Sequence, residues 1–540
     1  MKSHLKASLC QSLPGLLLGV LLGPVSLNHL HAEVNALHPG GVRIEPVITS
    51  IRTNSTNVTI QWQGSVGPYQ LLHATEMSTN MHWLKQGVAI DARSNTVPAQ
   101  AARDFYKISI PTPVFGAAVI CGDCHTNIYP TYTNTAHSSA IDLLKLAHSE
   151  TNPACLTCHT VGYGYQYGYK DEATTPYLAG VQCANCHGPA GRHSIYPNDL
   201  DKRPVKILAA ELCGGCHSGF HHPYYDEWAE SGHGVVVPDV ASSLLTGGEA
   251  RMKSCGPCHS GAVRVALVTG KPLPTAQEAA TTPITCAVCH DPHGGPFVSQ
   301  LRNPKSSMDP FNYSTATTTS FAAQYNPNIN ICGQCHNARG AQWTDTSRPP
   351  HHSPQYNILT GTIGFTDGNP VVNSEHTGID KQCTQCHTHA NPVPNPSLSN
   401  PNATGHTFIA KLNNCSPCHS EEGARVRIEI TQNEISQRIA DIKGLLDQWA
   451  TTMAPDKLKK YGALAWEYSS PGELSNPAGT SGVTGPVTAD QALVPNEIKQ
   501  ARFNLYLVAH DLSVGVHNGK YVRLLLQVAE NKVNQLLGTP

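Results

Sequence analysis

The sequence predicts a mainly α-helical and irregular central region, flanked by a small N-terminal all-β sandwich and a C-terminal region of long helices. Three observations support this fold class. Short alternating apolar runs occur before residue 113, nine Cys-x-x-Cys-His motifs occupy residues 121–419, and apolar residues recur at helical spacing after residue 424. The predicted segments are residues 1–32, 33–115, 116–422 and 423–540.

The first segment has the pattern of a secretory signal peptide. Lys2 and Lys6 give it a positive start, residues 13–27 form a short apolar run, and Ala32 is a suitable cleavage residue. The run is shorter than the about 20 residues that a membrane-spanning helix needs. We therefore expect an exported protein, periplasmic or extracellular, that does not span the membrane.

The second segment, residues 33–115, is expected to form the β-sandwich. Residues 58–62 (VTIQW), 69–74 (YQLLHA) and 105–110 (FYKISI) alternate in polarity and are separated by Asn, Ser and Gly turns. No Cys-x-x-Cys-His motif lies in this segment. It either packs against the rest of the chain or docks onto a partner, and the sequence leaves both roles open.

The third segment, residues 116–422, carries 18 of the 19 cysteines, and only Cys10 lies outside the nine motifs. We number these motifs 1 to 9 in chain order. Their cysteines are Cys121, Cys124, Cys155, Cys158, Cys183, Cys186, Cys213, Cys216, Cys255, Cys258, Cys286, Cys289, Cys332, Cys335, Cys383, Cys386, Cys415 and Cys418. Their histidines are His125, His159, His187, His217, His259, His290, His336, His387 and His419.

This pattern is the attachment signature of c-type haem, in which the two thiols bond to the porphyrin and the histidine binds iron. Structural zinc sites do not need a histidine directly after the second cysteine. Disulfide frameworks belong to small chains and do not repeat this motif. The sequence therefore predicts nine covalently bound haems as cofactors.

The haems change how the composition is interpreted. Charged residues are 14% of the chain, while Gly (45) and Pro (40) are abundant, so the central region needs the porphyrins as packing material. The formal protein charge is −2. Since each ferric haem adds one negative charge, the oxidised protein has a charge of about −11 and the reduced protein about −20. This charge disfavours nucleic acid and favours basic surfaces of redox partner proteins.

Three stretches resemble a known superfamily. Residues 155–193 (CLTCHTVGYGYQYGYKDEATTPYLAGVQCANCHGPAGRH) resemble the haem-pair segment of multihaem cytochromes related to hydroxylamine oxidoreductase and of their tetrahaem electron carriers. Residues 121–137 (CGDCHTNIYPTYTNTAH) resemble their opening motif with its distal histidine. Residues 501–533 (ARFNLYLVAHDLSVGVHNGKYVRLLLQVAENKV) are similar to the closing helices of ammonia-forming nitrite reductases. The resemblance implies that His187 and His193, six residues apart, bind two different irons.

Second axial ligands should also be histidines, because the motif region holds twelve further histidines but only two methionines. The expected distal ligands are His137, His193, His233, His293, His376 and His406, together with His222 from the doublet 221–222 and His352 from the doublet 351–352. The ninth iron is bound by His148 or His389, or keeps an open position.

The fourth segment is expected to form long helices. Apolar residues have helical spacing over residues 428–449, a Gly/Pro/Ser/Thr-rich linker covers 470–494, and a second helical pattern covers 495–537 with an interruption at 515–519. Such amphipathic helices pack on the haem region or on a second copy of the chain. The sequence thus leaves a homo-oligomer open.

The state of the ninth iron separates the function classes. With every iron bound by two histidines the protein is an electron carrier, whereas one open iron makes it a reductase of nitrite, hydroxylamine or tetrathionate. A third alternative is an extracellular filament of stacked subunits. All nine motifs end in His and no Cys-x-x-Cys-Lys motif occurs, which disfavours a standard nitrite reductase. The sequence favours the carrier, and whether the protein is an enzyme stays open.

Overall fold

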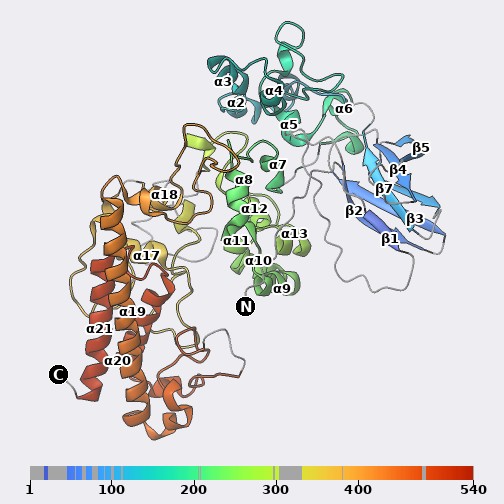
Figure 1. The fold of residues 1–540 in the computed structure, drawn as a ribbon. Coiled ribbons are helices and arrows are strands. Elements are labelled where there is room, and N and C mark those ends of the chain that lie inside the picture. The colour runs from blue at the N-terminus through green and yellow to red at the C-terminus, as the bar shows by residue number, and fades with distance from the viewer. Residues whose placement is uncertain are drawn as a thin grey trace, which may run out of the picture. The chain divides into compact units, whose positions relative to one another are not determined.

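The computed structural model describes residues 18–21 and 46–538, apart from gaps at 55, 64–68, 76–82, 91, 99–102, 111–112, 205, 207, 296–297, 303–330, 380 and 477–481. Helices follow an N-terminal group of strands (Figure 1), so the predicted mainly helical fold with a small antiparallel β region is confirmed. Across these residues no helix is both long and apolar enough to cross a membrane. Most of the proposed signal peptide, with Lys2, Lys6, Cys10 and Ala32, lies outside the described residues.

The chain forms two compact units, each built from three stretches. One comprises Met1–Asp226, Thr285–Gln300 and Val393–Asn402, and the other comprises Glu227–Ile284, Leu301–Pro392 and Ala403–Pro540. Motifs 1, 2, 3, 4 and 6 lie in the first unit, and motifs 5, 7, 8 and 9 lie in the second.

The β region consists of two antiparallel sheets, with strand orders β1-β7-β4-β5 and β2-β3-β6. Alternate residues point inward, so Ile60, Trp62, Tyr69 and Ile108 are buried in one core. The strands are β1 (Leu18–Leu21), β2 (Val47–Thr53), β3 (Asn57–Gln63), β4 (Tyr69–Ala74), β5 (Leu84–Ile90), β6 (Ser94–Pro98) and β7 (Arg103–Ser109). Strand β1, which pairs with β7, comes from the apolar run of the proposed signal peptide.

Short helices carry the motif region, because Gly and Pro interrupt the chain between motifs. They are α1 (Ala118–Gly122), α2 (Tyr129–Tyr132), α3 (Ala140–Leu146), α4 (Pro153–His159), α5 (Cys183–His187), α6 (Gly191–Ile195), α7 (Glu211–Gly214), α8 (Tyr224–Glu230), α9 (Pro238–Thr246), α10 (Gly248–Ser254), α11 (Gly256–His259), α12 (Gly261–Val268), α13 (Ala276–Thr281), α14 (Cys286–Cys289), α17 (Gln355–Thr360) and α18 (Gln382–His387).

Three longer helices pack together at the C-terminus: α19 (Glu421–Thr452), α20 (Asn496–His510) and α21 (Gly519–Leu537). Ser420 caps α19 by accepting a hydrogen bond from the Gly423 N–H. The core between these helices contains Trp449, Trp466 and Tyr506, each at most 2% exposed. This packed region gives the neighbouring motif loops a rigid support.

Candidate haem-binding sites

Each motif is built on about one helical turn. In motifs 1, 4, 5, 6, 7 and 9 the N–H of the motif histidine donates to the carbonyl of the first motif cysteine, at 2.8–3.1 Å. Residues four apart lie on the same face of a helix, and so do residues three apart. The turn therefore presents both thiols and the imidazole on one side, as attachment to one porphyrin requires.

In the first unit, thiols of different motifs touch one another. Cys121 of motif 1 is hydrogen-bonded to Cys183 of motif 3. Likewise, motif 4 is in thiol contact with motif 2 through Cys216 and Cys158, and with motif 6 through Cys213 and Cys286. The described cysteines form no disulfide. Attachment points of neighbouring motifs are thus adjacent.

The second unit has the same organisation. Cys335 of motif 7 contacts Cys258 of motif 5, while Cys332 of motif 7 contacts Cys383 of motif 8. Cys386 of motif 8 lies close enough to Cys415 of motif 9 for the charge of one thiol to raise the pKa of the other, after the larger effect of burial. Motifs 5, 7, 8 and 9 therefore form a connected series.

Six motif histidines face a second histidine across a similar gap. The ring centres are 6.0 Å apart in His137–His217 and His187–His293, 6.1 Å in His233–His336, 6.2 Å in His259–His351 and His387–His517, and 6.4 Å in His376–His419. Each pair joins one motif histidine to one non-motif histidine. Since a metal–imidazole bond is about 2.0 Å long, two rings on opposite sides of one iron have centres about 6 Å apart. The observed ring-centre distances therefore fit two imidazoles bound to one iron.

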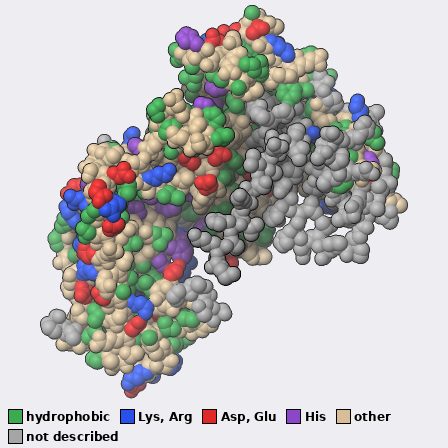
Figure 2. Space-filling view, in the orientation of Figure 1, with side chains coloured by type: hydrophobic (Ala, Val, Ile, Leu, Met, Phe, Trp, Pro, Cys, Tyr) green, Lys and Arg blue, Asp and Glu red, His purple; other side chains and the backbone are tan. Residues whose placement is uncertain are grey.

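Burial favours, for several of these imidazoles, the neutral form that binds metals. Desolvation lowers the pKa of His217 and of His233 to about 4, and the facing histidine lowers it further in both cases. Desolvation similarly lowers the pKa of His351 to about 3. Figure 2 shows histidine side chains, in purple, on the face of the molecule drawn there.

Two further pairs are indicated by electrostatics. Burial lowers the pKa of His193, and the charge of His125 in motif 1 lowers it further. The His193 Nδ1 atom is buried without a hydrogen-bond partner, which an added ligand would relieve. Burial also lowers the pKa of His222, and the charges of His221 and of His159 in motif 2 lower it further.

Several imidazoles are oriented through Nδ1. His159 bonds the Ala140 carbonyl at 2.8 Å, His290 the Ser299 carbonyl at 2.7 Å and His387 the Phe408 carbonyl at 2.8 Å. A carbonyl can only accept, so Nδ1 carries a proton, and in the neutral ring the lone pair is on Nε2. This is the tautomer that a metal-binding histidine uses when its other nitrogen is held by a carbonyl.

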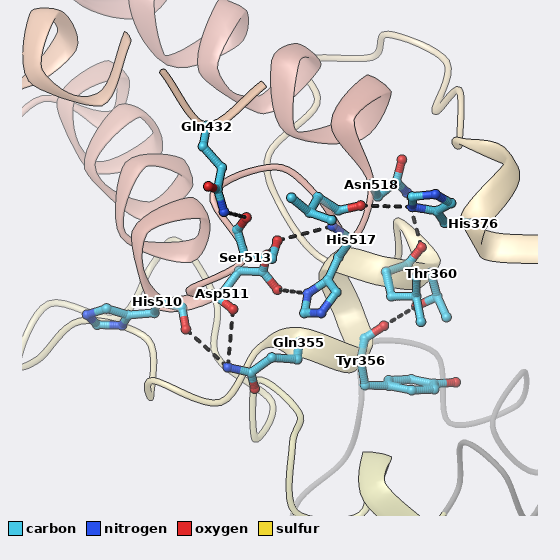
Figure 3. Close-up of polar contacts among 12 residues, drawn as sticks. Gln355, Tyr356, Thr360, His376, Gln432, His510, Asp511, Ser513, His517 and Asn518 are labelled. Carbon is cyan, nitrogen blue, oxygen red and sulfur yellow. Dashed lines mark hydrogen bonds and ion pairs between the residues drawn. The ribbon is translucent and has the colours of Figure 1, made fainter. Parts of the chain in front are cut away.

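His517 is a candidate ligand that the sequence did not point to. It lies between α20 and α21 and faces His387 of motif 8. Its Nδ1 is 2.7 Å from Oδ1 of the fully buried Asp511, whose other oxygen is hydrogen-bonded to Ser513 (Figure 3). Burial alone would lower the pKa of His517, but the Asp511 carboxylate raises it. This histidine follows motif 9 in the chain, beyond the region in which distal ligands were expected.

The remaining expected ligands, His352, His406, His148 and His389, are not among the six facing pairs. His351, rather than the chosen His352, faces His259 of motif 5, while His352 lies beside Glu473. His406 lies near Thr404 and Phe408. His148 is exposed after α3 with a φ of 50°, and His389 is half-buried.

Comparison with known proteins shows sequence matches to the motif region. Residues 120–188 match the family model of cytochrome c554 and c-prime. The multihaem cytochrome MtrA of Shewanella baltica is 30% identical over 172 residues, which cover 28% of this chain and 49% of that protein. Cytochrome c-554 of Nitrosomonas europaea is 30% identical over 131 residues, covering 18% of this chain and 56% of that protein. The chain thus spans about half the length of these curated relatives.

Two solved structures are similar at low identity. The outer cell wall cytochrome OcwA has a TM-score of 0.48 and 18% identity, over 78% of this chain and 99% of that one. An undecahaem cytochrome from the S-layer of Carboxydothermus ferrireducens has a TM-score of 0.42 and 19% identity, over 90% of this chain and 62% of that one. The motifs and the sequence matches together define the class: the chain is a multihaem c-type cytochrome.

Proposed function

We propose that the protein is an electron carrier that binds nine c-type haems and conducts electrons along them. The observation that carries this proposal is the set of six facing histidine pairs at 6.0–6.4 Å. An iron bound by two histidines has no position left for a substrate, so it can exchange electrons but not catalyse reduction. Bis-histidine ligation also gives a low reduction potential compared with His/Met ligation.

The thiol contacts support a route for the electrons within each unit. In the first unit motif 4 is central, since its cysteines touch those of motifs 2 and 6 and lie near Cys186 of motif 3. In the second unit the series runs through motifs 5, 7, 8 and 9. Haems attached at touching cysteines would have adjacent attachment edges, which favours electron transfer between them.

The segments have separate roles in this proposal. Residues 1–32 direct export, so the mature protein acts in the periplasm or outside the cell, where thioether attachment takes place in bacteria. Residues 33–115 form a β domain, 116–422 the nonahaem domain, and 423–540 a helical region that supports it or pairs with a second copy. We place the protein near the hydroxylamine oxidoreductase superfamily, which the match of residues 120–188 to the cytochrome c554 family supports.

Mass and spin state test the proposal together. The protein is exported from a host with cytochrome c maturation, and its intact mass should show nine haem additions. Electron paramagnetic resonance of the oxidised protein should show low-spin iron only. A mass with fewer haems contradicts the haem count, and a high-spin signal that changes when nitrite is added identifies a reductase instead.

A further inference from the structure

We propose that His352, Glu473 and His510 form a binding site for a divalent first-row transition-metal cation, separate from the haem irons. The three side chains offer ligand atoms that all lie within 4.8 Å of one another. His352 Nδ1 is 3.2 Å from Glu473 Oε1, and His510 Nε2 is 2.7 Å from Glu473 Oε2. Two imidazoles and one carboxylate are a donor set that such cations use widely.

The hydrogen bonds of His510 already bring two of the ligand atoms together. Its Nδ1 is 2.7 Å from the Pro350 carbonyl, and its Nε2 is 2.7 Å from Glu473 Oε2. The carbonyl only accepts, so Nδ1 carries a proton, and a second proton is shared between Nε2 and the carboxylate. A cation bound between these two atoms would take the place of that second proton. The bond from Nδ1 to a backbone carbonyl is also the usual orientation of a metal-binding histidine.

Rigid surroundings hold two of the ligands. His510 is the last residue of α20, and its side chain is only 7% exposed. Tyr506, one turn earlier on the same face, stacks edge-on against His510 with ring centres 5.3 Å apart, and its hydroxyl accepts from the Gly472 N–H. Because Gly472 is hydrogen-bonded to Tyr506 of α20, the backbone directly before Glu473 is held against the helix that carries His510. The Gln355 amide donates to the carbonyls of His510 and Asp511 (Figure 3).

His352 is the third ligand, since the two histidines of the doublet face different partners. His351 faces His259 of motif 5, and its Nδ1 is 2.9 Å from Ser353 Oγ. The His352 ring instead lies 5.4 Å from the His510 ring. Side chains of His352 and Glu473 are 60% and 59% exposed, so small rotations bring all three atoms to about 2.1 Å from one cation.

The exposure of the site determines how readily the cation exchanges, and its location determines which haem the cation affects. A half-open set of three ligands leaves further positions to water, so the cation exchanges with solvent. The His351 and His352 rings are 4.8 Å apart, which places the cation beside the haem of motif 5. A positive charge near an iron favours its reduced form, so occupancy should raise the potential of that haem.

Zinc binding to the exported, haem-loaded protein tests the site. After treatment with EDTA, the protein is dialysed against Zn²⁺, and zinc per protein is measured by elemental mass spectrometry. The parent should bind one Zn²⁺ more than the variants His352→Ala and Glu473→Gln, with affinity at least about tenfold weaker in each variant. Matched controls are His221→Ala, from the other doublet, and Glu230→Gln, which is exposed in the same unit; both should bind zinc like the parent.

Spin state separates this proposal from the haem assignments. His352→Ala should leave all low-spin signals unchanged, and zinc should raise one haem potential in the parent but in neither ligand variant. Equal zinc content in parent and variants would overturn the site. A high-spin haem in His352→Ala would also overturn it, by making His352 an iron ligand, while leaving the electron-carrier function intact.

Discussion

Hydrogen bonds from Nδ1 to backbone carbonyls orient several imidazoles of the candidate iron ligands, among them His159, His376 and His387. In His376 the Nδ1 atom is 2.9 Å from the Val516 carbonyl, one residue before His517, so two candidate ligands for different motifs are tied to one turn (Figure 3). This turn therefore holds the His376 and His517 imidazoles in a fixed relation to each other. Loss of one ring should therefore affect one iron and leave the neighbouring pair in place.

His193 offers the first test at this scale. In the variant His193→Ala no thioether cysteine changes, so the haem number in the intact mass should stay the same. One haem should turn from low to high spin, because a strong axial ligand is lost, and should bind carbon monoxide where the parent does not. The neighbouring variant Arg192→Ala should show neither change. Unaltered spin state in His193→Ala would make His193 an ordinary loop histidine.

Asp511 and His517 offer a second test. The variant His517→Ala should create one high-spin haem, since His387 then has no facing imidazole. Asp511→Asn should keep the haem low-spin but raise its potential, because a neutral amide makes His517 a weaker electron donor to iron. Potentiometric titration with optical detection measures both. If Asp511→Asn leaves every midpoint unchanged, the carboxylate does not act on a haem.

Motif ligands could be predicted from spacing alone, and four of the expected distal histidines, His137, His233, His293 and His376, each face a motif histidine. Spacing fixes each motif histidine, and the class of protein inferred from it is confirmed by the sequence matches. A distal histidine depends on what the fold brings across the porphyrin, so His351 and His352 could not be told apart. For the same reason His517, 130 positions after its facing histidine, gave no local signal.

Among the elements, the C-terminal helices hold a buried acid that makes their stability depend on pH. Glu467 is fully buried; its Oε1 accepts from the Tyr506 hydroxyl at 2.5 Å and its Oε2 from the Tyr468 N–H at 2.9 Å. Burial raises the pKa of Glu467 from 4.5 to about 7, despite these bonds and the charge of Arg502. Between these two pH values the folded state keeps a proton that the unfolded state releases.

Stability of this region should therefore fall as pH rises from about 4.5 to 7, by at most about 3 kcal/mol for Glu467 alone. Hydrogen exchange of α20 at pH 5 and pH 7.5 measures the opening free energy. In Glu467→Gln the dependence on pH should be weaker, because the side chain no longer titrates. The exposed Glu421→Gln should keep the parent's dependence, and an identical dependence in Glu467→Gln would contradict the assignment.

Periodicity located the long helices because their apolar faces pack on protein, as Ile435, Ile442 and Leu446 of α19 do. The short helices of the motif region carry no such pattern. We expect their apolar surface to meet porphyrin rather than protein, and a motif turn such as α14 has only four residues. Their arrangement could not be predicted from residues alone.

For the whole molecule, the nine proposed haems would carry more net charge than the protein does. The protein contributes −2, and nine ferric haems would bring the total to about −11. Full reduction would then add nine electrons to one molecule in which charged residues are only 14% of the chain. Screening at physiological salt acts over about 8 Å, so neighbouring haems within a unit still interact.

Reduction should consequently be coupled to proton uptake. Each added electron raises the pKa of nearby propionates and of histidines that do not bind iron, because it favours their protonated forms. Proton uptake on reduction makes a midpoint potential fall as pH rises, by up to about 59 mV per pH unit when one proton follows one electron. Potentiometric titrations at pH 6 and pH 8 should show this fall for some haems and little change for others. Midpoints that are all the same at both pH values would mean that the electrons' charge is compensated by ions of the solvent rather than by groups of the protein.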